Sequence, residues 1–157
     1  MKLAIAEVIA TSFYAGYTPK APGTAGAAVG VLLVYLLHHF AFFTPLHLAG
    51  FVLLTLGPAI WATNCLIDAM QIKDPQCVVV DEVLGQMLAF LTASLDRPVS
   101  YLLAFVLFRA FDIWKPFPVN LLEKLPRGIG VIADDLMAGL FAAFVIYLLR
   151  NFLNLPL

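Results

Sequence analysis

Charge is the scarcest property of this sequence. Only 12% of its 157 residues are charged, whereas 62% are hydrophobic, and the mean hydropathy is +0.96. A soluble domain of average composition carries roughly 25% charged residues. The composition therefore excludes an ordinary soluble domain and indicates a single membrane-embedded domain over residues 1–157.

The sequence also lacks an excess of basic residues. It has nine Lys and Arg against ten Asp and Glu, so its formal net charge is -1. Because binding to nucleic acid requires many phosphate-neutralising cations, a nucleic-acid partner is not expected. The two cysteines, Cys65 and Cys77, form no ligand-spaced motif and are expected to be free thiols. Glu7 interrupts the first apolar stretch, which we expect to stay in the mature protein.

Long hydrophobic runs are abundant and predict an all-α, polytopic bundle of membrane helices. Each run approaches the roughly 20 residues that a helix needs to cross a bilayer, although the fourth is short. Residues 3–17 are too short for a span, so we expect an N-terminal helix that lies in the interface or re-enters the membrane. Prolines and glycines predict a loop at 20–26. About five spans are predicted, near residues 25–43, 46–67, 78–95, 99–114 and 134–152.

Five spans would bring most polar segments to one face of the membrane. The opposite face would hold Arg97 and Arg150 alone among the lysines and arginines of the links and the C-terminal end. An excess of lysine and arginine marks the cytoplasmic side. We therefore expect the polar clusters to meet at the cytoplasmic interface. The basic residues on that face are Lys20, Lys73, Lys115, Lys124 and Arg127.

Two pairs of adjacent acids are predicted at helix starts on this face. They are Asp81–Glu82 and Asp134–Asp135. Helix N-termini favour negative charge, but capping explains one acid per helix rather than two. Four clustered carboxylates would repel one another unless a cation lay among them, and oxygen ligands suit Mg²⁺ or Mn²⁺. All four acids are therefore predicted metal ligands, and Asp81 and Asp134 are predicted to be catalytic as well.

The stretch 108–118 adds two basic groups and a fifth acid to the same face. Arg109 and Asp112 are three residues apart, so they can pair on one side of a helix, and Lys115 lies one turn further on. A neutralised ion pair with a snorkelling lysine is the plainer interpretation. Beside the acid pairs, however, Arg109 and Lys115 become candidate phosphate-binding groups. Asp112 then becomes a catalytic candidate, as metal ligand or general base.

Two glycine-bearing segments, 22–26 and 128–130, complete the predicted ring. Backbone amides of such segments can approach a phosphate closely. Ordinary turn or helix-packing glycines are the simpler interpretation of each segment alone. A charged turn is likewise the simplest interpretation of residues 73–75. The remaining candidate contacts to the phosphate or head group are Lys20, Thr24, Lys73, Asp74, Gly128 and Gly130.

A divalent metal, basic groups and backbone amides at a membrane surface describe a site for a phosphate monoester whose tail lies in lipid. A small transporter or ion pathway that uses intramembrane carboxylates is the competing hypothesis. It predicts polar groups along the whole length of the helices, whereas the second span and the outer halves of the later ones are nearly apolar. A purely structural subunit gives no reason for two acid pairs.

Four stretches together resemble the phosphatidylglycerophosphatase A family. The resemblance implies a Mg²⁺-dependent lipid phosphatase of the bacterial inner membrane, with its active site on the cytoplasmic side. Its expected reaction converts phosphatidylglycerophosphate to phosphatidylglycerol and inorganic phosphate. Attack by metal-activated water is expected, and an aspartyl-phosphate intermediate is the alternative. The four stretches are 22–26 (PGTAG), 73–85 (KD and VDEVLG at its two ends), 108–118 (FRAFDIWKPFP) and 128–139 (GIGVIADDLMAG).

Overall fold

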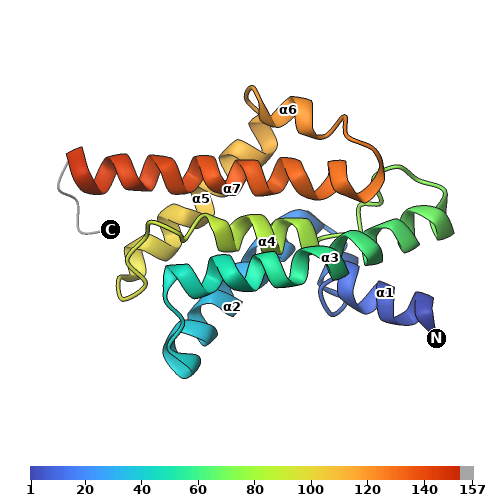
Figure 1. Ribbon diagram of the computed structural model, residues 1–157, viewed down its shortest axis with the longest axis horizontal. Helices are drawn as coiled ribbons and strands as arrows, with labels where there is room; N and C mark the ends of the chain where they lie inside the picture. The colour runs from blue at the N-terminus through green and yellow to red at the C-terminus, as the bar shows by residue number, and fades with distance from the viewer. Residues whose placement is uncertain (153–157) are drawn as a thin grey trace.

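The computed structural model describes residues 1–152, and helices are the only regular elements within this range. The predicted all-α class is therefore confirmed. Helix α4 lies in the middle of the bundle and contacts α2, α3, α5 and α7 (Figure 1). The elements are α1 (Lys2–Ala10), the 3₁₀ helix η1 (Ala15–Tyr17), α2 (Pro22–Ala41), α3 (Pro45–Met70), α4 (Val80–Leu88), α5 (Pro98–Trp114), α6 (Val119–Leu122) and α7 (Arg127–Phe152).

Three helices are long and apolar enough to cross a membrane. They are α2 with 20 residues, α3 with 26 and α7 with 26. These helices contain most of the predicted spans 25–43, 46–67 and 134–152. Helix α5 has 17 residues, at the lower limit for a span, and matches the prediction for 99–114. The protein is accordingly a membrane protein.

The predicted span 78–95 is helical over only part of its length. Helix α4 ends at Leu88, and turns follow it as far as residue 97. Almost every residue of α4 is buried among the other helices. A short apolar run is as typical of a buried core helix as of a span, so length and hydropathy could not separate the two.

Two further boundaries differ from the prediction. Helix α2 begins at Pro22, so most of the expected loop 20–26 is helical. Proline suits the first turn of a helix because a backbone N–H at that position would have no partner within the helix. Helix α7 begins at Arg127, well before Asp134, so its acid pair lies inside the helix rather than at its start. The short helix α6 lies in the link between α5 and α7.

Glycines allow α4 to lie in close contact with its neighbours. A Cβ on Gly30 of α2 would lie 2.9 Å from the Cβ of Gln86 in α4. On the other side of α4, a Cβ on Gly139 of α7 would overlap the carbonyl oxygen of Gly85. Small residues at contacts of this kind let membrane helices approach at backbone distance. The α4–α7 contact brings the two acid pairs to the same end of the bundle.

Candidate active site

A cavity of about 700 Å³ opens at this end of the bundle. The starts of α2 and α4, the end of α5 and the first turns of α7 contribute to its wall. The polar segments predicted to share one face therefore do meet. Three basic residues line the cavity, namely Lys73, Arg109 and Lys115. The acidic residues that line it are Asp74, Asp81, Glu82, Asp112, Glu123, Asp134 and Asp135.

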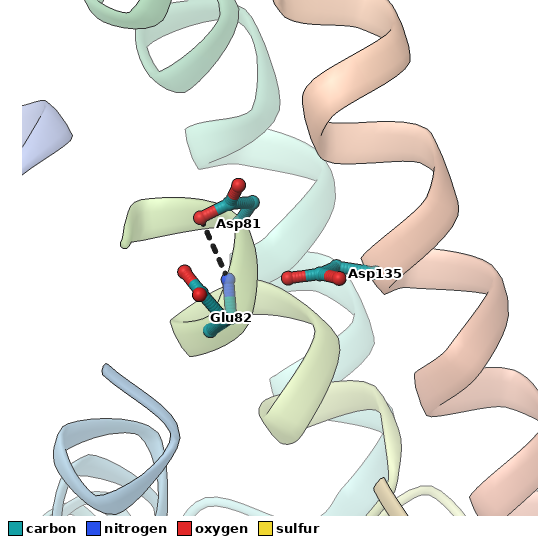
Figure 2. A group of neighbouring side chains, drawn as sticks. All are labelled: Asp81, Glu82 and Asp135. Carbon is teal, nitrogen blue, oxygen red and sulfur yellow. Dashed lines mark hydrogen bonds between the residues drawn. The ribbon is translucent and has the colours of Figure 1, made fainter. Parts of the chain in front are cut away.

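Three carboxylates form a compact cluster in the cavity: Asp81, Glu82 and Asp135 (Figure 2). One oxygen from each lies within 4.8 Å of the others. Asp81 and Asp135 are only 6% and 5% exposed, and the Oε2 atom of Glu82 is buried without a hydrogen-bond partner. Buried carboxylates with unused oxygens fit the ligand chemistry of a hard divalent cation.

The local fold explains how acids from two helices converge. Asp81 and Glu82 occupy the first turn of α4, and the Asp81 carboxylate accepts a hydrogen bond of 3.0 Å from the backbone N–H of Glu82. Asp135 arrives from α7, which touches α4 at Gly85: a Cβ there would lie 2.5 Å from the Asp135 carbonyl oxygen. The glycine contact therefore sets the separation of the carboxylates.

Asp134 lies apart from this cluster, although it was predicted to be a fourth metal ligand. Its carboxylate is 3% exposed and accepts a hydrogen bond of 2.6 Å from the Lys115 ammonium group. Lys115 comes from the end of α5 and also donates a hydrogen bond of 3.0 Å to the Glu123 carboxylate. Asp134 is thus neutralised by the protein itself.

Glu123 is a cavity residue that the sequence analysis missed. The hydrogen bond from Lys115 holds the pKa of Glu123 below its ordinary value. Burial lowers the pKa of Lys115, but its hydrogen bonds to Asp134 and Glu123 outweigh burial and raise that pKa above its ordinary value. Lys115 therefore keeps its positive charge at the cavity wall. Glu123 lies eight residues after Lys115, beyond Pro116, Pro118 and the short helix α6, so no single helix relates the two residues.

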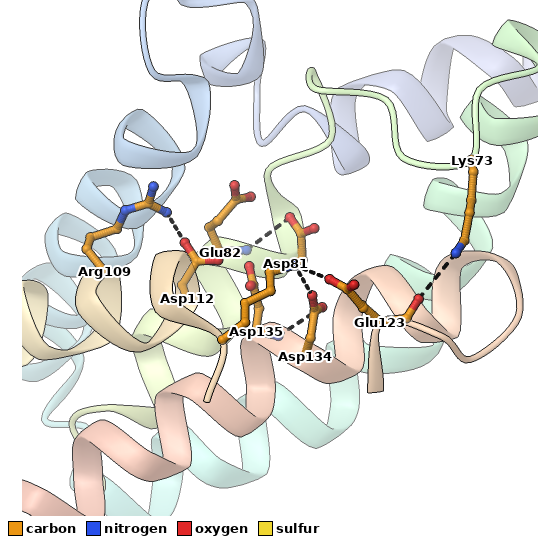
Figure 3. A network of polar contacts seen from close by, with 9 residues as sticks. Lys73, Asp81, Glu82, Arg109, Asp112, Glu123, Asp134 and Asp135 are labelled. Carbon is orange, nitrogen blue, oxygen red and sulfur yellow. Dashed lines mark hydrogen bonds and ion pairs between the residues drawn. The ribbon is translucent and has the colours of Figure 1, made fainter. Parts of the chain in front are cut away.

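Arg109 and Asp112 form the ion pair that their spacing predicted (Figure 3). Both side chains are largely buried, at 16% and 14% exposure. The Nε atom of Arg109 is buried without a hydrogen-bond partner. Its Nη1 atom lies 3.2 Å from the place that a Cβ on Gly23 would occupy, so Gly23 leaves room for the guanidinium group.

The other predicted contacts divide into two groups. Lys73 and Asp74 line the cavity, and Lys73 donates a hydrogen bond of 3.5 Å to the carbonyl oxygen of Glu123. Lys20 and Thr24 are not in the cavity wall, which Pro19, Ala21, Pro22 and Gly23 reach from the same segment.

Gly128 and Gly130 have packing roles instead of lining the cavity. The Gly128 amide donates a hydrogen bond of 2.9 Å to the Asn64 side chain, so it is not free for a phosphate. Gly130 packs so closely that a Cβ would overlap the carbonyl oxygen of Leu125. The structure therefore supports the simpler interpretation of these two glycines, in which they serve helix packing.

Buried charge is concentrated at this site. Among residues 1–152, the fully buried charged side chains are Asp81, Asp134 and Asp135, and all three line the cavity. Between the cavity and the opposite end, the buried polar side chains are uncharged and few, such as Gln86 and Ser100. This distribution disfavours an ionisable path along the helices, which a transporter of the kind considered above would require.

This chain is similar to a known protein family and to several named relatives. The family model described as Phosphatidylglycerophosphatase A matches residues 8–150. A Bacteroides thetaiotaomicron protein named "Putative phosphatidylinositol-3-phosphatase" is 39% identical, covering 91% of this chain and 92% of its own length.

Two relatives named Phosphatidylglycerophosphatase A are also similar. The one from Escherichia coli is 29% identical, covering 92% of this chain and 83% of its own length. The one from Haemophilus influenzae is 34% identical, covering 92% and 88%. Among solved structures, none matches the chain significantly. Since the family model matches residues 8–150, a range that includes every segment of the cavity wall, this chain belongs to the phosphatidylglycerophosphatase A family.

Proposed function

We propose that this enzyme hydrolyses the terminal phosphate monoester of phosphatidylglycerophosphate, releasing phosphatidylglycerol and inorganic phosphate. The observation that carries the proposal is the buried cluster of Asp81, Glu82 and Asp135 beside Arg109 and Lys115 in a membrane protein of this family. Carboxylates for a cation and basic groups for an anion are what hydrolysis of a phosphate monoester requires.

The proposed cofactor is Mg²⁺, with Mn²⁺ as an alternative. Asp81, Glu82 and Asp135 would hold it, because their oxygens already lie within reach of one centre and Glu82 has an unused buried oxygen. When bound, the ion would polarise the phosphoryl oxygens and make a water molecule more acidic. Asp134 would act through Lys115 in this scheme, instead of binding the ion.

The basic side chains would bind and orient the phosphate. Lys115 projects into the cavity with its charge maintained by Asp134 and Glu123. Arg109 is fixed by Asp112, and its buried Nε retains a free donor. Such preorganised cations stabilise the negative charge of the transferring phosphoryl group.

Asp112 is the proposed general base. Its carboxylate pairs with Arg109 at the cavity wall, where it could accept a proton from the attacking water. The water oxygen bonds to phosphorus as the ester P–O bond breaks, and the leaving glycerol oxygen takes up a proton. An aspartyl phosphate on one of the acids is the alternative route. Trapping of covalent phosphate after an acid quench would establish that alternative.

The proposed location is the bacterial inner membrane, with the cavity facing the cytoplasm. Lys73, Lys115 and Arg109 line the cavity, while Arg97 and Arg150 lie toward the other end of the bundle, where Arg150 donates to the carbonyl oxygen of Thr92. An excess of basic residues is typical of the cytoplasmic side.

A second candidate substrate is a phosphorylated inositol lipid. The relative from Bacteroides thetaiotaomicron, at 39% identity, carries the name of a phosphatidylinositol-3-phosphatase. Both candidate substrates present a phosphate monoester on a lipid head group, so the same carboxylates and basic residues would serve either.

The decisive experiment measures phosphate release by the full-length protein in lipid nanodiscs. Phosphatidylglycerophosphate, phosphatidylinositol 3-phosphate and phosphatidic acid are compared with EDTA and after Mg²⁺ is restored. We expect preference for phosphatidylglycerophosphate, loss of release with EDTA, and loss in Asp81→Asn. Release that survives both chelation and the substitution would contradict the metal assignment. Preference for the inositol lipid would select the second candidate.

A further inference from the structure

We propose that the groove between α2 and α5 holds one acyl chain of the lipid substrate while its phosphate lies in the active-site cavity. This inference rests on the function proposed above, since it concerns the tail of the same substrate. The groove is defined here by Ala28, Val31, Leu32, Tyr35, Tyr101 and Phe105, all of which line surface hollows on these two helices.

The groove lies about one helical turn beyond the cavity. The same two helices form one wall of the cavity, through Gly23 of α2 and Arg109 of α5. About one helical turn further along, Ala28 and Phe105 line a hollow of about 230 Å³. A second hollow of about 390 Å³ continues past Tyr35 and Tyr101. A lipid with its phosphate in the cavity could therefore extend its tail directly into the groove.

The antiparallel packing of α2 and α5 sets the direction in which the groove runs. The two helices run antiparallel, since Gly23 lies near Arg109 at one end and the Tyr35 and Tyr101 rings are 6.0 Å apart further along. At the far end, His38 of α2 lies 3.1 Å from Asp96, just before α5. The groove thus leads from the polar cavity along an apolar wall to a second polar region.

The length and chemistry of the groove fit an acyl chain. Twelve residues separate Gly23 from Tyr35, which corresponds to about 18 Å of helix at about 1.5 Å per residue. One leaflet contributes about 15 Å of the hydrocarbon core of a bilayer. Leu32 and Leu102 remain 56% and 65% exposed along the groove, and apolar surface of this kind within a membrane is open to lipid.

Ala28 is the position at which the groove can be closed with little effect on the fold. Its side chain is exposed and lines both hollows, so a larger side chain would fill the groove without entering the core. Leu53 of α3 offers a matched control, because it is 72% exposed and lies outside the groove. Ala28→Trp and Leu53→Trp therefore introduce the same ring on two apolar surfaces.

The first test compares long-chain dipalmitoyl and short-chain dihexanoyl phosphatidylglycerophosphate as substrates in phosphate-release assays. We expect Ala28→Trp to raise KM for the long-chain lipid severalfold, because the indole ring would occupy the space that the acyl chain fills in the groove. Short-chain hydrolysis and both activities of Leu53→Trp should stay near wild type. An equal loss on both chain lengths, or an equal loss in Leu53→Trp, would overturn the proposal.

The second test does not require hydrolysis. Phosphatidic acid with a diazirine at the end of one acyl chain is photolysed in nanodiscs that contain the full-length protein and EDTA. Labelling is expected at residues 28–35 and 101–106, with loss of that labelling in Ala28→Trp. Labelling there, combined with no phosphate release from any lipid in the Mg²⁺ assay, would reject the proposed function and keep the groove. Phosphate release in that assay, combined with labels spread equally over the Leu53 face of α3, would reject the groove alone.

Discussion

Asp134 and Asp135 are adjacent in the sequence but have different surroundings in the bundle. Asp134 is neutralised by Lys115 at 2.6 Å. Asp135 faces Asp81 and Glu82, and no basic side chain within residues 1–152 forms an ion pair with any of these three. Burying a carboxylate is costly unless an opposite charge compensates it. Asp134 therefore has its counter-charge within the protein, whereas the proposed metal ion would supply the counter-charge for Asp135.

Two adjacent acids can therefore have different roles: Asp134 pairs with Lys115, and Asp135 lies in the carboxylate cluster. Successive residues of a helix point about 100° apart, so Asp134 turns toward the end of α5 while Asp135 turns toward α4. Substituting the residues around Asp134 and around Asp135 separately tests this difference, and the largest effect is expected at Asp135.

Asp135→Asn should have the largest effect on activity. Removing one of the three clustered carboxylates weakens cation binding, and hydrolysis should fall by about a hundredfold or more, since even indirect partners of a metal site contribute about 10–100-fold. Without Mg²⁺ the variant should melt at a higher temperature than wild type, because one buried like-charge repulsion is gone. Thermal unfolding with EDTA and with Mg²⁺ measures both effects.

Asp134→Asn is the matched control for that experiment. It should keep the increase in melting temperature on addition of Mg²⁺, since Asp134 lies with Lys115 rather than in the cluster. The division between the two residues would be wrong if Asp134→Asn lost the Mg²⁺ effect and Asp135→Asn kept it.

Lys115→Met should have the largest effect on stability. It leaves Asp134 buried and unpaired, and breaking a buried pair from one side costs about 3–5 kcal/mol. The double variant Lys115→Met/Asp134→Asn should recover most of the lost unfolding free energy but not the lost activity. Reversible denaturant unfolding in detergent measures the difference. A double variant no more stable than Lys115→Met would show that the pair is not the cause.

Gly139→Ala should have an intermediate effect, through the contact that holds the two helices together. Its Cβ would overlap the Gly85 carbonyl oxygen, and forcing extra volume into a packed contact costs about 1–3 kcal/mol. Affinity for Mg²⁺ should fall because Asp135 moves relative to Asp81. Gly50→Ala is the control: nothing lies within 4 Å of its Cβ, and helix propensity favours it by about 0.5–1 kcal/mol. Equal effects of the two substitutions would contradict this account.

Glu123→Gln should have the smallest effect. The pKa of Glu123 is lowered in the folded protein, so its contribution to stability is present above its unfolded pKa of about 4.5 and is lost as the pH falls through the folded value. The difference in melting temperature between Glu123→Gln and wild type should therefore be constant near neutral pH and shrink below about pH 4.5. A difference that grew on acidification would exclude this role for Glu123.

The sequence predicted which residues line the cavity better than it predicted how the helices are arranged around it. Spacing alone predicted the Arg109–Asp112 pair, and charge asymmetry predicted that the polar segments would share one end of the bundle. The position of Glu123 could not be predicted, since its partner Lys115 lies beyond an irregular link. The burial of α4 could not be predicted either, because lipid and protein interior favour the same apolar residues.

Composition and hydrophobic run length were enough to determine a helical membrane protein, because only helices satisfy the backbone of such long apolar segments within a bilayer. Motif order was enough to indicate the family. Which carboxylates share a cation site was decided by the tertiary structure, through the close contact of Gly85 with Gly139 and the reach of Lys115 to Asp134. These are distances between helices, and no spacing within one helix specifies them.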